Sequence, residues 1–97
     1  MRYAARTDAN QSEIVEALRA AGASVWVIGL PVDLLVGFRG VTIPMEVKTL
    51  NGKRNPKPAP HTKLQVDFMR TWNGGPVPTV TDAQGALRAI RIIEAKG

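Results

Sequence analysis

The sequence predicts one α/β domain in which helices flank a mixed central sheet. The chain has 97 residues, a length that suits one domain and not two. Helical periodicity occurs near both ends and after a proline-rich stretch, whereas three strand-like runs follow one another in the first half. The predicted order is therefore αβββαβα over residues 1–97.

The first half of the chain predicts a helix and three strands. Ile14 and Leu18 recur at helical spacing, and Asn10 is the expected N-cap. The β-branched and aromatic run that follows predicts a buried strand. A tight turn at Arg39 and Gly40 separates the next two strands. We expect these four elements at residues 10–21, 24–28, 32–38 and 41–49.

The second half begins with a loop and ends in a helix. Residues 51–60 contain three prolines and three basic residues, which predicts a mobile, positively charged loop. Leu64, Phe68 and Trp72 are spaced four apart along a second helix. Together with Trp26, the two aromatic residues fit core packing better than stacking on nucleic-acid bases. The remaining elements are helix 62–72, strand 76–80 and a final helix that Thr81 caps and that buries Leu87, Ile90 and Ile93.

Composition narrows the classes of partner. The chain carries 13 Lys+Arg against 8 Asp+Glu, and the net charge of +5 favours a polyanionic partner such as nucleic acid. It contains no cysteine, which excludes disulfides and thiolate metal sites. No apolar run approaches the roughly 18 residues of a membrane span, and the N-terminus lacks the apolar core of a secretory signal. We therefore expect a cytoplasmic protein without a membrane partner.

The strongest chemical signal lies in the predicted hairpin of strands 32–38 and 41–49. If the chain turns at Arg39 and Gly40, opposed residue numbers sum to 79, which places Asp33 opposite Glu46. Their Cβ atoms would then lie about 4.5–5.5 Å apart on one face of the sheet. Such opposed carboxylates repel each other unless a cation compensates, and oxygen ligands of this kind suit Mg²⁺ or Mn²⁺.

Lys48 completes the cluster. It lies two residues beyond Glu46 on the same face of the strand, where an ammonium group can orient water or stabilise a phosphorane-like transition state. The alternative is a salt-bridged cluster with a purely structural role, because ion-pair networks resemble active sites.

These residues resemble a known nuclease signature. Pro31-Val-Asp33 followed by Glu46-Val-Lys48 is similar to the PD-(D/E)XK pattern, although Val32 stands between the proline and the aspartate. The wider run is similar to the stand-alone virus-type replication-repair nuclease (VRR-NUC) domains of phages over residues 10 to 93. The matching segments are Asp33-Leu-Leu-Val-Gly37, Met45-Glu-Val-Lys48, Gly52-Lys53, Leu64-Gln65 and Gly75-Pro-Val-Pro78.

The resemblance implies a restriction-endonuclease-like αβββαβ core and a divalent-metal phosphodiesterase that acts on DNA. Asp33, Glu46 and the Val47 carbonyl correspond to metal ligands, and Lys48 to the residue that positions the attacking water. Glu13 corresponds to an acidic residue that reaches the metal, and Gln65 to a glutamine that supports Lys48 or the phosphate. Both also fit helix-capping patterns, after Asn10 and Thr62 respectively.

Basic residues near the proposed site are candidates for phosphate contacts. They are Lys53, Arg54 and Lys57 in the proline-rich loop and Lys63 at the start of the second helix. His61 is more simply explained as a solvated loop residue than as a catalytic base.

The combined prediction is a Mg²⁺- or Mn²⁺-dependent DNA endonuclease that hydrolyses phosphodiester bonds and takes part in DNA repair or replication. Its small size suggests cleavage directed by structure, at junctions, flaps or nicks, and a junction-cleaving enzyme would need a homodimer. If a phage encodes it, it would act in the bacterial cytoplasm. The alternatives are a non-catalytic nucleic-acid-binding module on a nuclease-like scaffold and a small protein-interaction domain.

Overall fold

The computed structural model describes residues 9–48 and 63–96 of the chain. Helices and strands follow one another in the predicted order, which confirms the α/β class. The predicted loop 51–60 lies outside the described residues. The elements are α1 (Ala9–Ala20), β1 (Ser24–Val27), β2 (Leu34–Phe38), β3 (Val41–Val47), α2 (Lys63–Thr71), β4 (Thr79–Val80) and α3 (Ala83–Lys96).

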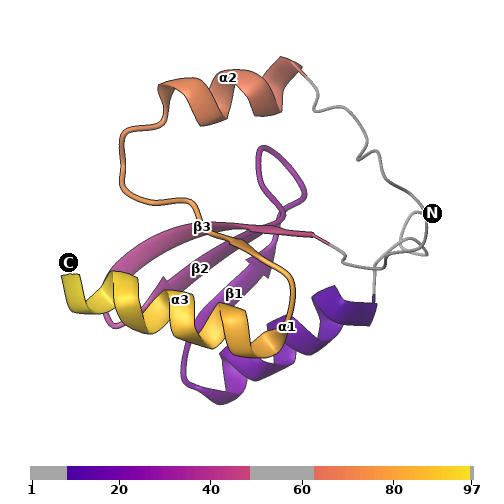
Figure 1. Ribbon diagram of the computed structural model, residues 1–97, viewed down its shortest axis with the longest axis vertical. Helices are drawn as coiled ribbons and strands as arrows, with labels where there is room; N and C mark the ends of the chain where they lie inside the picture. Colours follow the sequence, from indigo (N-terminus) through magenta and orange to yellow (C-terminus); the bar gives the residue numbers. More distant parts are fainter. Residues whose placement is uncertain (1–8, 49–62, 97) are drawn as a thin grey trace.

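The four strands form one mixed sheet in the order β1-β2-β3-β4. The first three strands are antiparallel, and β4 pairs parallel to β3. Helices α1 and α3 pack against each other and against one face of the sheet, whereas α2 lies apart from them on the other side (Figure 1). We call the face beneath α1 and α3 the inner face and the opposite one the outer face.

The β2–β3 hairpin has the predicted turn and register. Arg39 and Gly40 form its two-residue loop with positive φ angles of 53° and 84°, as a type I′ turn requires. The pairing runs from Phe38 opposite Val41 to Leu34 opposite Met45, so opposed residue numbers sum to 79 as expected. This register determines which side chains of the two strands share a face.

The hydrophobic core lies between the inner face and the helices. On β3, Ile43 and Met45 are fully buried on the inner face, as predicted. Pro44 and Glu46 are buried too, so burial does not alternate along this strand as the sequence suggested. Burial of each such side chain contributes about 1.5–3 kcal/mol. Other fully buried core residues are Ile14, Leu18, Leu34, Val36, Ala86 and Ile90.

The three aromatic residues predicted for the core lie elsewhere, so this prediction was wrong. Trp26 is 71% exposed because β1 is an edge strand whose outer face no described helix covers closely. Only Val25 of that strand is buried, so the expectation of a buried strand also fails. Helix α2 has no buried residue, and its Phe68 stacks on Trp72, the residue that follows the helix, with ring centroids 5.1 Å apart.

Two helix caps also differ from the predictions. Helix α1 begins at Ala9, so Asn10 lies within it, and the Asn10 Oδ1 atom accepts no hydrogen bond from residues 9–48 or 63–96. The capping explanation for Glu13 therefore fails. At α3 the cap is Asp82 instead of Thr81, because Asp82 Oδ1 accepts a 2.8 Å hydrogen bond from the Gly85 amide. None of the helices in the described ranges is long and apolar enough to span a membrane.

Candidate active site

Asp33 is held at the point where β2 begins. Its carbonyl oxygen accepts hydrogen bonds from the amides of Ile28 (3.0 Å) and Gly29 (3.2 Å), which anchor its backbone to the end of β1. Its side-chain Oδ2 atom accepts a 2.8 Å hydrogen bond from the Val47 amide on β3. The carboxylate thus replaces the main-chain acceptor that would continue the β2–β3 ladder, and its position relative to β3 is fixed.

Glu46 lies opposite Asp33 when the register is extended by one residue. Hydrogen-bonded and non-hydrogen-bonded pairs alternate from the turn, which makes Asp33 and Glu46 a non-hydrogen-bonded pair with close side chains. The Glu46 amide points away from β2 and donates instead to the Pro78 carbonyl at 2.9 Å. The two carboxylates therefore share the outer face, and Glu46 is only 9% exposed.

Lys48 follows on the same face of the chain as Glu46. Its amide donates to the Val80 carbonyl at 2.9 Å, so the parallel β3–β4 pairing holds its backbone in place. None of the ion pairs within residues 9–48 and 63–96 includes Lys48. The purely structural alternative, a salt-bridged cluster, remains an alternative.

The Val47 carbonyl oxygen is the third metal ligand that the nuclease resemblance implied. Within a strand, the N–H and C=O groups of one residue point to the same side. Because the Val47 amide points to Asp33, its carbonyl oxygen also points to that side of β3. Asp33 Oδ1 accepts no hydrogen bond in the described part of the chain, so it is available to a cation.

Asn10 is a residue of this region that sequence reasoning missed. Its side-chain amide donates to the carbonyls of Lys48 (3.0 Å) and Thr81 (3.3 Å). It thereby ties the start of α1 to the exits of β3 and β4, directly at the candidate lysine. The sequence signal, an asparagine near a helix start, suggested a cap instead, because nothing local indicates a partner 38 residues away.

Glu13 and Gln65 are the remaining predicted metal-site and catalytic residues that the structure describes. Glu13 is exposed on α1, and among described residues no three His, Cys, Asp or Glu side chains gather as a metal site. Gln65 lies in the first turn of α2 and is half-buried, whereas its neighbours Leu64 and Val66 are exposed. The roles suggested for Glu13 and Gln65 remain predictions.

The predicted phosphate-binding residues fall mostly outside the described ranges. This is the case for Lys53, Arg54 and Lys57, and for His61 as well. Lys63 is described and exposed, but its Nζ atom lies 3.6 Å from an Asp67 oxygen. Asp67 also pairs with Arg70 at 3.3 Å, so α2 presents little free positive charge.

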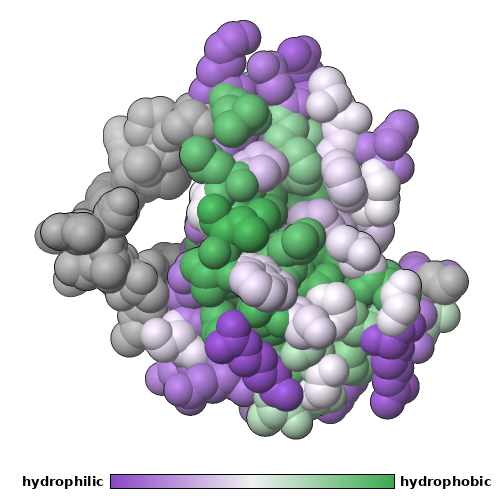
Figure 2. Space-filling model, turned by 180° about the vertical axis from the view of Figure 1, so that it is seen from behind, coloured by the Kyte–Doolittle hydropathy of each residue, from purple (hydrophilic) through white to green (hydrophobic). Residues whose placement is uncertain are grey.

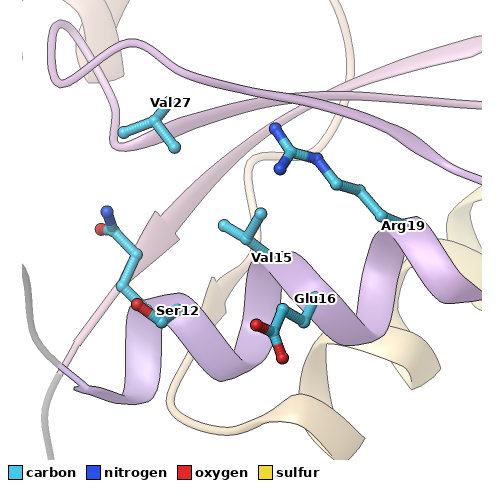
Figure 3. A pocket seen from close by; sticks show the side chains of 6 residues that line it. Ser12, Val15, Glu16, Arg19 and Val27 are labelled. Atoms are coloured by element: carbon cyan, nitrogen blue, oxygen red, sulfur yellow. The ribbon is translucent and has the colours of Figure 1, made fainter.

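A separate hollow lies between α1 and the β1 edge. It has a volume of about 260 Å³, and Ser12, Val15, Glu16, Arg19 and Val27 line it (Figure 3). Arg19 reaches across to donate a 2.7 Å hydrogen bond to the Val25 carbonyl. This contact occupies an outward-facing acceptor of the edge strand and protects it against pairing with another chain.

The outer face is apolar next to the carboxylates. Figure 2 shows a continuous hydrophobic area over the middle of the molecule, with hydrophilic residues at its margins. Trp26 and Leu35 pair across β1 and β2 on this face and remain 71% and 39% exposed. Stacking of Trp26 on a base, which the sequence left as an alternative, remains a prediction.

Comparison of the chain with family models, curated proteins and solved structures finds no match. The assignment of a function therefore depends on the site itself.

Proposed function

We propose that this protein is a divalent-metal-dependent endonuclease that hydrolyses phosphodiester bonds in DNA. The observation that carries the proposal is the placement of Asp33 on the Val47 amide, opposite Glu46. Two carboxylates on one sheet face repel each other. A divalent cation bound between them would offset this repulsion.

The oxygen ligands available at this site fit Mg²⁺ or Mn²⁺. Asp33 Oδ1, the Glu46 carboxylate and the Val47 carbonyl would hold the ion, and all three are the hard oxygen ligands that such ions prefer. The Val47 amide orients the aspartate before any ion binds, which lowers the conformational cost of binding. When bound, the ion would supply Lewis-acid polarisation of the phosphate and promote ionisation of water.

The reaction is attack of water on phosphorus. The water oxygen loses a proton to solvent and forms a bond to phosphorus, the bond to the leaving ester oxygen breaks, and that oxygen takes up a proton from solvent. Lys48 would hold the water in line and stabilise the charge that develops on the phosphate oxygens. Asn10, through its bond to the Lys48 carbonyl, would keep the lysine backbone beside the carboxylates.

The fold also supports the proposal. A mixed sheet whose central hairpin carries the acidic residues agrees with the restriction-endonuclease-like core that the PD-(D/E)XK resemblance implies. The net charge of +5 suits a DNA substrate. For the substrate we propose DNA with a structural irregularity, such as a junction, flap or nick; cleavage of a junction would require a homodimer.

The test is incubation of the purified chain with Mg²⁺ or Mn²⁺ and a panel of linear, nicked, flapped and four-way DNAs. We expect metal-dependent cleavage, lost by at least a hundredfold in Asp33→Asn and Lys48→Met, since such groups act directly on the transition state. Asp67→Asn and Lys96→Met are matched controls on exposed surfaces and should cleave normally.

Two outcomes would overturn the proposal. One is cleavage that survives in Asp33→Asn, because activity would then come from another site or from a contaminant. The other is salt-sensitive DNA binding without any turnover, which would favour the non-catalytic binding module.

A further inference from the structure

Two arginines of α3 are exposed and have no acidic partner. Arg88 and Arg91 lie three residues apart, and neither takes part in an ion pair with a described residue. Arg19, by contrast, donates to a strand carbonyl. Three further basic residues, Arg39, Lys63 and Arg70, form ion pairs with acidic residues. The α3 pair is therefore a concentration of uncompensated positive charge.

A polar hollow leads to these arginines from β4. It has a volume of about 460 Å³ and runs between β4 and α3, with Thr79, Thr81, Gln84 and Arg88 in its wall. A second hollow of about 360 Å³ continues along α3, where Gln84, Arg88 and Arg91 line it together with the apolar residues Leu87 and Ile92. Hydroxyl, amide and guanidinium groups can all donate hydrogen bonds to phosphate oxygens.

The first hollow reaches β4, the edge strand that pairs with β3 at Glu46 and Val47. Thr79 is the parallel partner of Glu46, is exposed, and lies on β4, the edge strand of the sheet. Helix α3 starts at Ala83, so Arg88 and Arg91 lie about 7.5 and 12 Å along its axis. Because the carboxylates lie on the outer face and α3 covers the inner face, a strand of nucleic acid at Glu46 would pass around the β4 edge at Thr79 to reach α3.

The positive charge of this surface favours the binding of an anion. Asp82 is the only acidic residue in either wall, and its Oδ1 atom is engaged by the Gly85 amide. Two guanidinium groups face this one carboxylate. Neighbouring residues on a helix face are about 5–6 Å apart, so each arginine can contact a phosphate of its own.

We propose that Arg88 and Arg91, with the hollow between β4 and α3, bind the phosphate backbone of DNA where it passes around the β4 edge of the sheet. This inference rests on the proposed function, because DNA is taken as the ligand. It extends the DNA footprint to α3, beyond the residues that the sequence suggested.

The test measures DNA binding separately from cleavage. Affinity for a fluorescent DNA duplex is determined by anisotropy in EDTA at several salt concentrations. Compared with the wild type, Arg88→Gln/Arg91→Gln should lower the salt slope by about 2 and weaken binding about tenfold per arginine at about 0.1 M salt. Arg88→Lys/Arg91→Lys keeps both charges and should retain most of the slope.

The charge-matched control is Arg39→Gln/Arg70→Gln, which removes the same total charge from the hairpin turn and from α2. It should weaken binding less than threefold. Equal losses in both glutamine variants would overturn the inference, because net charge alone would then explain binding. Wild-type protein that binds no DNA, or that binds poly-glutamate with the same dependence on Arg88 and Arg91, would also overturn it.

The readouts distinguish this inference from the proposed function. Loss of affinity in the α3 variant without any cleavage by the wild type would refute the nuclease and leave the DNA surface intact. Normal cleavage and affinity in the α3 variant would refute the surface and leave the nuclease intact.

Discussion

Replacement of Asp33 by asparagine tests whether the two carboxylates are placed for a cation. The substitution removes one charge of the opposed pair and keeps an oxygen that can accept the hydrogen bond from the Val47 amide. We expect the metal-free variant to be at least as stable as the wild type. In Mg²⁺ the order should reverse, because only the wild type retains the full ligand set.

The magnitudes follow from the geometry. Two unit charges about 5 Å apart repel by about 1 kcal/mol in water and about 3 kcal/mol at an effective dielectric constant of about 20. A neutral acceptor on the Val47 amide is weaker than a charged one by about 1 kcal/mol. The free energy of unfolding of Asp33→Asn without metal should therefore exceed that of the wild type by about 0–2 kcal/mol. Mg²⁺ at about 100 times its Kd would stabilise the wild type by about 2.7 kcal/mol.

The assay is urea unfolding of both proteins in EDTA and in Mg²⁺. Asp67→Asn serves as the control, because Asp67 pairs only with surface cations and should respond equally in both buffers. The reasoning is refuted if Asp33→Asn in EDTA is less stable than the wild type by more than about 1 kcal/mol, which would mean that the carboxylate is a stabilising partner. A wild type whose stability Mg²⁺ does not change would refute it as well.

Three further substitutions test the fold. Asn10→Leu removes the hydrogen bonds to the carbonyls of Lys48 and Thr81, which follow β3 and β4. The free energy of unfolding, measured in urea, should fall by about 1–3 kcal/mol. An unchanged midpoint would show that water replaces both bonds. Ile90→Ala should lower the free energy of unfolding by about 2–5 kcal/mol because Ile90 is fully buried. Ile92→Ala should lower it much less because Ile92 is 53% exposed. Similar losses in the two variants would contradict the described packing of α3. Trp26→Ser should change the thermal midpoint by only a few degrees, since Trp26 is 71% exposed, and a large fall would mean that the ring is covered.

The order of elements and the register of the β2–β3 hairpin could be predicted from the amino-acid sequence. Both follow from local chemistry: a two-residue turn with Gly40 sets the pairing, and the alternation of Ile43 and Met45 sets the buried face. From these alone, Asp33 could be placed opposite Glu46. The residues of the candidate site that lie on one hairpin were therefore predictable.

Which surfaces are covered, and which distant segments of the chain meet, could not be predicted without the three-dimensional packing. Apolar periodicity identifies a hydrophobic stripe but does not say whether another element packs on it, so the exposure of Trp26 on an edge strand was not foreseen. In the same way, the bond from Asn10 to Lys48 and the polar hollow between β4 and α3 join residues far apart in the chain. Such contacts depend on how helices pack against the sheet, and local sequence chemistry does not encode that packing directly.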